Sequence, residues 1–129
     1  IGMALACHLD KKRYFVFCLM GDGELDEGQV WEAAMFAGKN QLDNLICVID
    51  RNNIQIDGDT EDIMPLEPLR EKYEAFNWHV IECNGNDIAD VARALDLPAN
   101  GPRPVAPSSE AVSTRTSICA ASALRTYMK

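Results

Sequence analysis

The chain has 129 residues, of which 47% are hydrophobic, and this suits a single globular unit with an apolar core. Its formal net charge of −8 argues against nucleic acid as a partner, because affinity for nucleic acid depends largely on Lys and Arg that neutralise phosphates. No apolar run approaches the roughly 18 residues that a membrane-spanning helix needs, so we expect no membrane partner.

The first part of the chain predicts a helix followed by a buried strand. Residues 1–6 are small and apolar, and they read as part of a helix. Residues 14–20 form a continuous apolar run rich in aromatic and branched side chains, which is the pattern of a strand covered on both faces. The run stops at Gly21, so we expect the strand to end there.

A crossover helix and a second strand come next. Apolar residues recur at helical spacing from Asp26 to Lys39, and Gly38 near the end is a helix stop signal. Residues 45–49 predict a second buried strand, which ends at Asp50. Two buried strands joined by a helix are expected to be parallel, because the helix returns the chain in the same direction.

The alternation of helices and strands continues towards residue 95. Helices are predicted at about residues 68–76 and 87–95, with a strand at residues 79–82 between them. The sequence therefore predicts an α/β fold with an open, mostly parallel sheet and helices on both faces.

The end of the chain has a different composition. Residues 98–107 contain four prolines, and residues 108–122 are dominated by Ser, Thr and Ala. We interpret residues 1–97 as one partial domain and residues 98–129 as a tail to which the pattern assigns no structure. The tail could be a linker, a disordered segment or a sequence outside its proper reading frame. If the frame was lost near Asp96, the sheet would lack one strand and expose an unpaired edge.

The cysteines favour a reducing compartment. They are odd in number, widely spaced and contain no C-x-x-C pair, so neither a disulfide framework nor a zinc site is indicated. Those in or beside the apolar runs behave as small hydrophobic residues when reduced. We therefore expect a cytoplasmic protein. The five positions are Cys7, Cys18, Cys47, Cys83 and Cys119.

Two polar residues directly follow the first two predicted strands. Asp22 comes after the first strand and Asn52 after the second. Ligands of open α/β sheets bind outside the carboxyl ends of the strands, so both oxygens are expected in one crevice. A carboxylate, an amide and a main-chain oxygen suit Mg²⁺, which completes its octahedron with phosphate oxygens. Taken singly, each position could instead be an ordinary turn.

The two glycines beside Asp22 also fit a phosphate-binding turn. Gly21 and Gly23 lack a Cβ, so they allow a tight turn and a close approach of main-chain N–H groups to phosphate. The helix predicted from Asp26 would add its positive end. A diphosphate held through a metal is therefore compatible with an acidic chain.

The extended pattern resembles the transketolase family, and most closely its separately encoded amino-terminal subunits. The segments that carry the resemblance are residues 21–28 (GDGELDEG), 31–33 (WEA), 42–46 (LDNLI), 50–52 (DRN) and 56–58 (IDG). The resemblance covers residues 1 to about 95. It implies a thiamine diphosphate-binding fold, in which residues 1–97 are part of the diphosphate- and metal-binding domain.

The resemblance also implies cofactors and their ligands. The cofactors would be thiamine diphosphate and Mg²⁺ or Ca²⁺. The implied metal ligands are Asp22, Asn52 and the main-chain oxygen of Ile54. The implied cofactor-binding residues are Gly21, Asp22, Gly23, Glu24, Asn52 and Ile56. Of these, Gly23 would contact the diphosphate and Ile56 would pack on the thiazolium ring.

Glu27 has two interpretations. It matches a family glutamate near the dimer interface that is linked by hydrogen bonds to the cofactor sites, which raises a proton-relay role. The alternative is a glutamate in the first turn of a helix, where the helix dipole favours a negative charge.

The implied function is that of the amino-terminal part of a transketolase, a transferase of the pentose phosphate pathway. Such an enzyme transfers a two-carbon ketol unit between sugar phosphates. In the family, the following pyrimidine-binding domain, usually on a second chain, supplies the glutamate that activates the cofactor. For this chain the resemblance implies a carboxy-terminal transketolase subunit as that partner. The upstream substrate histidine of the family would precede Ile1, so the chain is expected to be a fragment. It is expected to need a partner subunit in a homo- or hetero-oligomer.

Other thiamine diphosphate enzymes share the metal motif. Deoxyxylulose-phosphate synthase, dihydroxyacetone synthase and the decarboxylating component of pyruvate dehydrogenase are the alternatives among enzymes. Residues 27–33 and 56–58 favour transketolase over these. An inactive, truncated binding module is the alternative outside enzymes.

Overall fold

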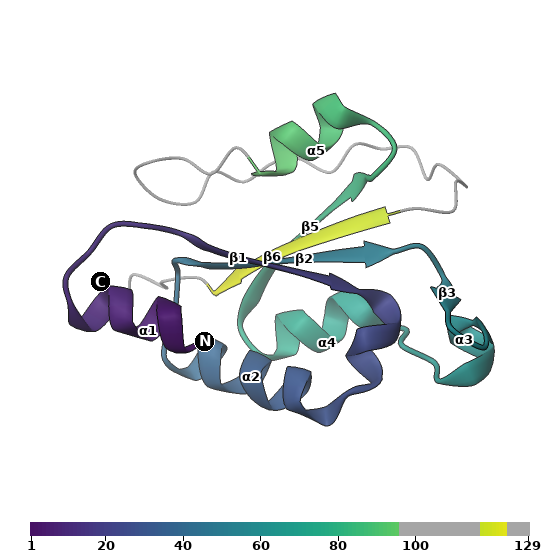
Figure 1. Ribbon diagram of the computed structural model, residues 1–129, viewed down its shortest axis with the longest axis horizontal. Coiled ribbons are helices and arrows are strands. Elements are labelled where there is room, and N and C mark those ends of the chain that lie inside the picture. Colours follow the sequence, from purple (N-terminus) through teal and green to yellow (C-terminus); the bar gives the residue numbers. More distant parts are fainter. Residues whose placement is uncertain (96–116, 124–129) are drawn as a thin grey trace.

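The computed structural model describes residues 1–95 and 117–123 (Figure 1). The helices are α1 (Gly2–Leu9), the 3₁₀ helix η1 (Asp22–Asp26), α2 (Gly28–Lys39), α3 (Thr60–Ile63), α4 (Leu69–Ala75) and α5 (Ile88–Leu95). The strands are β1 (Val16–Gly21), β2 (Leu45–Arg51), β3 (Ile54–Gln55), β4 (Gly58–Asp59), β5 (Trp78–Asn84) and β6 (Ser117–Ala123).

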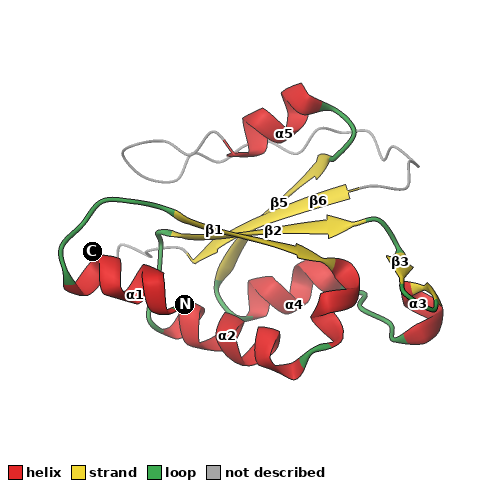
Figure 2. Ribbon diagram, viewed as in Figure 1, coloured by secondary structure: helices red, strands yellow, loops and turns green. Residues whose placement is uncertain are grey.

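The main sheet has the strand order β1-β2-β6-β5, and it lies between two layers of helices (Figure 2). Strands β1, β2 and β5 run in the same direction, and β6 is antiparallel to its neighbours β2 and β5. Helices α1, α2 and α4 lie on one face of the sheet and α5 lies on the other (Figure 1). The predicted α/β fold with a mostly parallel sheet and helices on both faces is confirmed.

Strand β6 lies within the segment to which the sequence pattern assigned no structure. Its Ala120 is the register partner of Val48 in β2 and of Ile81 in β5. The described sheet therefore has a strand between β2 and β5. The rest of the predicted tail, residues 98–116 and 124–129, lies outside the described residues, as does the predicted domain boundary at residue 97.

The prediction that the first strand is covered on both faces is wrong. Strand β1 starts at Val16, and Phe17 and Leu19 are 57% and 74% exposed. The reason is position, because β1 is an edge strand of the described sheet, whereas α5 packs against β5 at the other edge (Figure 1). Strand β2, which has a neighbour on each side, is almost fully buried as predicted.

The helix predicted from Asp26 begins later, at Gly28. Residues 22–26 wind into η1 instead, because the Glu24 carboxylate accepts a hydrogen bond from the Gly21 main-chain nitrogen at 2.7 Å. The Leu25 side chain is fully buried in the core, and its carbonyl accepts a hydrogen bond from Trp31 Nε1 at 2.8 Å. Burial of Leu25 therefore ties the turn after β1 to the body of the protein.

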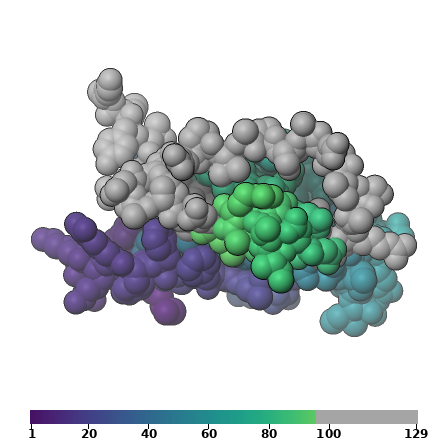
Figure 3. All heavy atoms as spheres, turned by 90° about the horizontal axis from the view of Figure 1, so that it is seen from above, coloured from purple at the N-terminus to yellow at the C-terminus, as the bar shows by residue number. Residues whose placement is uncertain are grey.

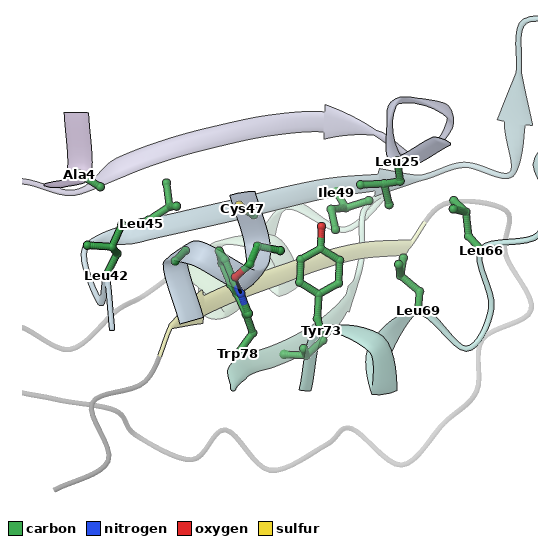
Figure 4. Close-up of a cluster of buried hydrophobic side chains, with 13 residues drawn as sticks. Ala4, Leu25, Leu42, Leu45, Cys47, Ile49, Leu66, Leu69, Tyr73 and Trp78 are labelled. Carbon is green, nitrogen blue, oxygen red and sulfur yellow. Dashed lines mark hydrogen bonds between the residues drawn. The ribbon is translucent and has the colours of Figure 1, made fainter. Parts of the chain in front are cut away.

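The core lies between the sheet and the layer of α1, α2 and α4 (Figure 4). The side chains of Leu45, Cys47 and Ile49 project from alternate positions of β2 into this layer, as the period of a strand requires. Tyr73 of α4 lies at the centre, with its ring centroid 5.7 Å from that of Trp78 in an edge-to-face arrangement. Such pairs stabilise a core beyond their buried area.

The segment from β3 to α3 lies at the end of the molecule opposite α1 (Figures 1 and 3). It follows β2 directly and is built on a short antiparallel hairpin, in which Ile54 pairs with Asp59. The sequence patterns did not predict this hairpin. Among the described residues, no helix has the length and apolar character needed to cross a membrane.

Gly38 allows the closest approach between α2 and the turn after α4. A β-carbon added at Gly38 would lie 1.9 Å from the Phe76 carbonyl oxygen, and Gly38 is buried. We expect Gly38→Ala to force the two segments apart and to lower the free energy of unfolding by about 1–3 kcal/mol. Urea denaturation followed by circular dichroism measures this loss.

Gly28→Ala is the matched control, because no atom lies within 4 Å of the β-carbon that it adds to the same helix. Alanine favours a helix over glycine by up to about 1 kcal/mol, so this variant should be as stable as the parent or more stable. Equal stability of the two variants would contradict the packing argument.

Candidate functional site

The candidate site forms where β1 and β2 end at the same edge of the sheet. Gly21, the last residue of β1, is the register partner of Asp50 in β2, and the two strands are parallel. Asp22 and Asn52 therefore leave neighbouring strands on the same side, as the sequence predicted. Strand direction alone brings them together, because the carboxyl ends of parallel strands share an edge.

The Asp22 carboxylate is buried, with 1% exposure, and it accepts four hydrogen bonds. Its Oδ2 atom accepts from Arg51 Nη1 at 2.7 Å, the Asn53 main-chain nitrogen at 2.9 Å and Thr60 Oγ1 at 3.2 Å. Its Oδ1 atom accepts from the Gly23 main-chain nitrogen at 2.9 Å. These donors hold the carboxylate in one orientation. They also offset the cost of burying it, because a buried charge is stable only when it is paired and hydrogen-bonded.

Arg51 connects three acidic side chains in this cluster. Its side chain is 9% exposed, and its guanidinium bonds to Asp22, to Glu61 and, at 3.3 Å, to Glu67. Burial opposes the charged form, but hydrogen bonds to Asp22 and Glu67 outweigh burial and raise the pKa of Arg51. Arg51 therefore joins the end of β2 to η1, α3 and the segment before α4.

Sequence reasoning missed Arg51, Thr60 and Glu61 as parts of the site. Thr60 is fully buried, and Glu61 accepts a hydrogen bond from the Leu66 main-chain nitrogen at 3.0 Å in addition to its bond with Arg51. Glu61 is therefore part of the charged cluster around Arg51. The sequence held one signal for helix α3, the capping residue Asp59. Its side chain accepts a hydrogen bond from the Glu61 main-chain nitrogen and caps this helix.

Asn52 lies beside Asp22, but its amide bonds within its own turn. Its Oδ1 atom accepts from the Ile54 main-chain nitrogen at 2.8 Å, and its Nδ2 atom donates to Asp50 Oδ2 at 3.1 Å. The next residue, Asn53, has a φ of 63° and turns its main-chain nitrogen towards Asp22. The turn is thus built by the side chain of Asn52 and anchored to Asp22 by the backbone of Asn53.

Oxygen atoms with spare acceptor capacity remain in this cluster. Asp22 Oδ1 accepts from the Gly23 nitrogen and Asn52 Oδ1 from the Ile54 nitrogen, whereas each oxygen has two lone pairs. Asp50 Oδ1 is buried and has no hydrogen-bond partner among the described residues. The donor set consists of carboxylate and amide oxygens, which fits Mg²⁺ or Ca²⁺.

No cluster of three or more His, Cys, Asp or Glu that could hold a metal occurs within residues 1–95. A magnesium site that is completed by phosphate oxygens needs only one or two carboxylates from the protein. The residues around Asp22 therefore fit a metal that arrives with a phosphorylated ligand.

The other predicted site residues lie in or next to η1, at the start of α2 and between β3 and β4. Gly23 lies against β3, where a β-carbon would come within 3.0 Å of Gln55 Cγ, so the close approach of η1 to β3 favours glycine. The Glu24 carboxylate is engaged with the Gly21 main-chain nitrogen. Glu27 is exposed at the start of α2 and makes no side-chain capping bond. Ile56, between β3 and β4, is 99% exposed.

Comparison with known protein families identifies the chain. Residues 8–126 match the family of the transketolase thiamine diphosphate-binding domain. The chain belongs to the transketolase family. The resemblance predicted from residues 21–58 is confirmed, and the family match includes part of the segment that follows residue 97.

Components of bacterial transketolases are among the similar proteins. The chain is 49% identical over 96 residues to the 6-deoxy-6-sulfo-D-fructose transketolase subunit of Clostridium sp., covering 74% of this chain and 35% of that protein. It is 48% identical over 95 residues to one subunit of the apulose-4-phosphate transketolase of Phocaeicola vulgatus, covering 74% of this chain and 34% of that protein. Human transketolase is 38% identical over 105 residues, covering 73% of this chain and 16% of that protein. The chain therefore spans about a third of the length of the two bacterial subunits.

The buried pair of Asp22 and Arg51 in this transketolase-family chain gives a stability prediction. Arg51→Met leaves the Asp22 carboxylate buried without its cation, and we expect a loss of about 3–5 kcal/mol in the free energy of unfolding. Asp22→Asn combined with Arg51→Met removes both charges, so it should be more stable than Arg51→Met alone. Urea denaturation of the single and double variants measures the coupling.

Arg70→Met is the matched control. Arg70 is 41% exposed and pairs with Glu74 at 3.0 Å, and such surface pairs contribute about 0–1 kcal/mol. If Arg51→Met costs no more than Arg70→Met, the Asp22 cluster does not organise this end of the sheet.

Proposed function

We propose that this chain is the metal- and diphosphate-binding part of a transketolase that transfers a two-carbon ketol unit between sugar phosphates. The observation that carries the proposal is the buried Asp22 carboxylate beside the Asn52-Asn53 turn, at the shared end of two parallel strands. Membership of the transketolase family supports thiamine diphosphate as the ligand of this arrangement.

Asp22, Asn52 and the main-chain oxygen of Ile54 would hold Mg²⁺ or Ca²⁺. The spare lone pairs on Asp22 Oδ1 and Asn52 Oδ1 support this assignment. Charge supports it too, because Arg51 is already bound to three carboxylates. A metal ion is therefore the group expected to offset the negative charge of a diphosphate in this acidic chain.

The turn of residues 21–24 would receive the diphosphate. Gly21 and Gly23 present no side chain there, so a phosphate group could approach the backbone of the turn closely. The Glu24 carboxylate would contribute indirectly, because it accepts a hydrogen bond from the Gly21 main-chain nitrogen and so fixes the shape of the turn. Leu25 anchors the same turn in the core, so the phosphate-binding backbone is rigid before any ligand arrives.

Two exposed residues would face the rest of the active site. When bound, thiamine diphosphate supplies the nucleophilic carbon for two-carbon transfer. The fully exposed Ile56 is suited to pack against the thiazolium ring, because covering an isoleucine stabilises by about 1.5–3 kcal/mol. Glu27 is exposed at the start of α2, where a proton-relay role towards a second polypeptide is open to it.

A second polypeptide would complete the site. Similar proteins are named as transketolase subunits, and the chain covers about a third of their length. In the family resemblance, the glutamate that activates the cofactor belongs to a pyrimidine-binding domain. We therefore propose that the partner is a carboxy-terminal transketolase subunit and that the substrates are sugar phosphates.

Isothermal titration calorimetry of the 129-residue chain tests the binding step. Thiamine diphosphate should bind in the presence of Mg²⁺ and not after chelation with EDTA. Asn52→Ala removes a proposed metal ligand but leaves the pair of Asp22 and Arg51, and it should weaken binding at least about tenfold. Asp22→Ala should abolish binding.

Asp62→Ala is the control for charge, because Asp62 is an exposed acidic residue of α3 that lies outside the proposed ligand set. It should bind the cofactor like the parent chain. Circular dichroism establishes that each variant is folded. Metal-independent binding, or unchanged binding by a folded Asn52→Ala variant, would contradict the proposed metal site.

An assay with a carboxy-terminal transketolase subunit tests the reaction. The reconstituted pair should consume xylulose 5-phosphate with a sugar-phosphate acceptor and should not consume pyruvate. Turnover of pyruvate would instead assign a decarboxylating or deoxyxylulose-phosphate synthase-like activity. Cofactor binding without turnover of either donor would assign a binding module.

A further inference from the structure

Two cysteines lie opposite each other in the middle of the parallel pair β1 and β2. The register of the two strands makes Cys18 and Cys47 direct partners. Directly opposed residues of neighbouring strands point to the same face of a sheet. Cys47 is part of the core on the α2 face, and Val16 and Met20, on either side of Cys18, pack against that core. Both thiols therefore belong to one face.

The spacing of the strands suits a covalent bond between the two sulfur atoms. Neighbouring strands lie about 4.7–4.9 Å apart. Disulfides join residues whose Cα atoms are about 4.4–6.8 Å apart. Residues that are direct register partners therefore fall within this range without a shift of either strand. Cys18 and Cys47 meet this condition through the hydrogen-bonded ladder that holds β1 to β2.

The two thiols differ in access to solvent. Cys18 is exposed on the edge strand, whereas Cys47 is buried. Burial, followed by the charge and hydrogen bond of Cys18, raises the pKa of the Cys47 thiol to about 12. Because the thiolate is the reactive form, Cys47 reacts slowly with reagents from solution. An oxidant therefore meets Cys18 first, and Cys47 is positioned as the second thiol.

We propose that Cys18 and Cys47 form a redox-sensitive dithiol, which low-molecular-weight disulfides such as oxidised glutathione convert into a cross-strand disulfide. In the first step, the Cys18 thiolate attacks one sulfur of the glutathione disulfide and releases one glutathione thiolate. In the second step, Cys47 gives up its proton, its sulfur attacks the Cys18 sulfur, and the second glutathione leaves as a thiol. The two cysteines lose two electrons, which reduce one glutathione disulfide to two thiols.

The cross-link would join the two strands that carry the candidate site. Cys18 lies in the strand that leads into Asp22, and Cys47 lies in the strand that leads into Asn52. In a reducing compartment such a disulfide forms only transiently, which is the behaviour of a redox sensor. The inference rests on the register of β1 and β2 and does not depend on the proposed function.

Peptide mapping of the 129-residue chain tests the proposal. The chain is incubated with oxidised glutathione, free thiols are blocked with N-ethylmaleimide, and the product is digested with trypsin without reduction. Trypsin, which cuts after Lys and Arg, places Cys18 in peptide 14–39 and Cys47 in peptide 40–51. We expect these two peptides to be linked. The intact protein should remain monomeric in mass and lose two hydrogen atoms, and dithiothreitol should reverse the change.

Three variants separate the linkage from general oxidation. Cys18→Ser changes an exposed residue, so it should fold normally and yield no linked peptide. Cys47→Ser should keep glutathione on Cys18 as a stable mixed disulfide. Cys7→Ser is the matched control, because Cys7 is buried and its thiol bonds to the Tyr14 carbonyl oxygen at 3.5 Å. It should form the linked peptide like the parent chain.

The same measurements can overturn the proposal. A mixed disulfide that persists on Cys18 in the parent chain would show that Cys47 cannot reach it. Linkage of Cys18 to a different cysteine, or linkage only between two molecules, would do the same. If Cys47→Ser fails to fold, the comparison of the parent chain with Cys18→Ser still tests the proposal. The linked peptide must form in the parent chain and must be absent from Cys18→Ser.

Discussion

The buried carboxylate of Asp22 is the constraint on which this end of the protein depends. A carboxylate with 1% exposure would be strongly destabilising without partners, and its donors come from η1, the end of β2, the turn after β2 and α3. These segments must converge for the charge to be satisfied. The position of the β3–β4 hairpin is therefore tied to the same carboxylate that is proposed to bind a metal.

Arg51 makes this arrangement possible and also limits what the site can do. Its guanidinium neutralises Asp22 and spans Glu61 and Glu67, so it holds η1, α3 and the segment before α4 at the end of β2. A cation held by three carboxylates has little capacity left for a phosphate. In a chain with a net charge of −8, recognition of a diphosphate then falls to a metal ion and to main-chain N–H groups. The acidity of the protein and its proposed phosphorylated cofactor are compatible for this reason.

The parallel register of β1 and β2 is the second organising feature. It places Asp22 and Asn52 at one edge, and in mid-strand it places Cys18 opposite Cys47. The edge position of β1 has a different consequence, because Phe17 and Leu19 are left exposed in the described structure. A rigid strand pair, anchored in the core through Leu45, Cys47 and Ile49, thus supports both a candidate cofactor site and a pair of opposed thiols.

The sequence by itself determined the first strand-helix-strand unit, the later helices and strand up to residue 95, and the meeting of Asp22 with the segment of Asn52. Local hydrophobic patterns identify the strand-helix-strand unit, and a crossover helix makes its strands parallel, so their carboxyl ends must share an edge. The tertiary structure alone decided the contacts of Arg51 and Thr60 with Asp22, the exposure of β1 and the insertion of β6 between β2 and β5. The physical reason is that periodicity records which residues prefer burial along one element, whereas strand order and the pairing of buried charges depend on how distant segments pack.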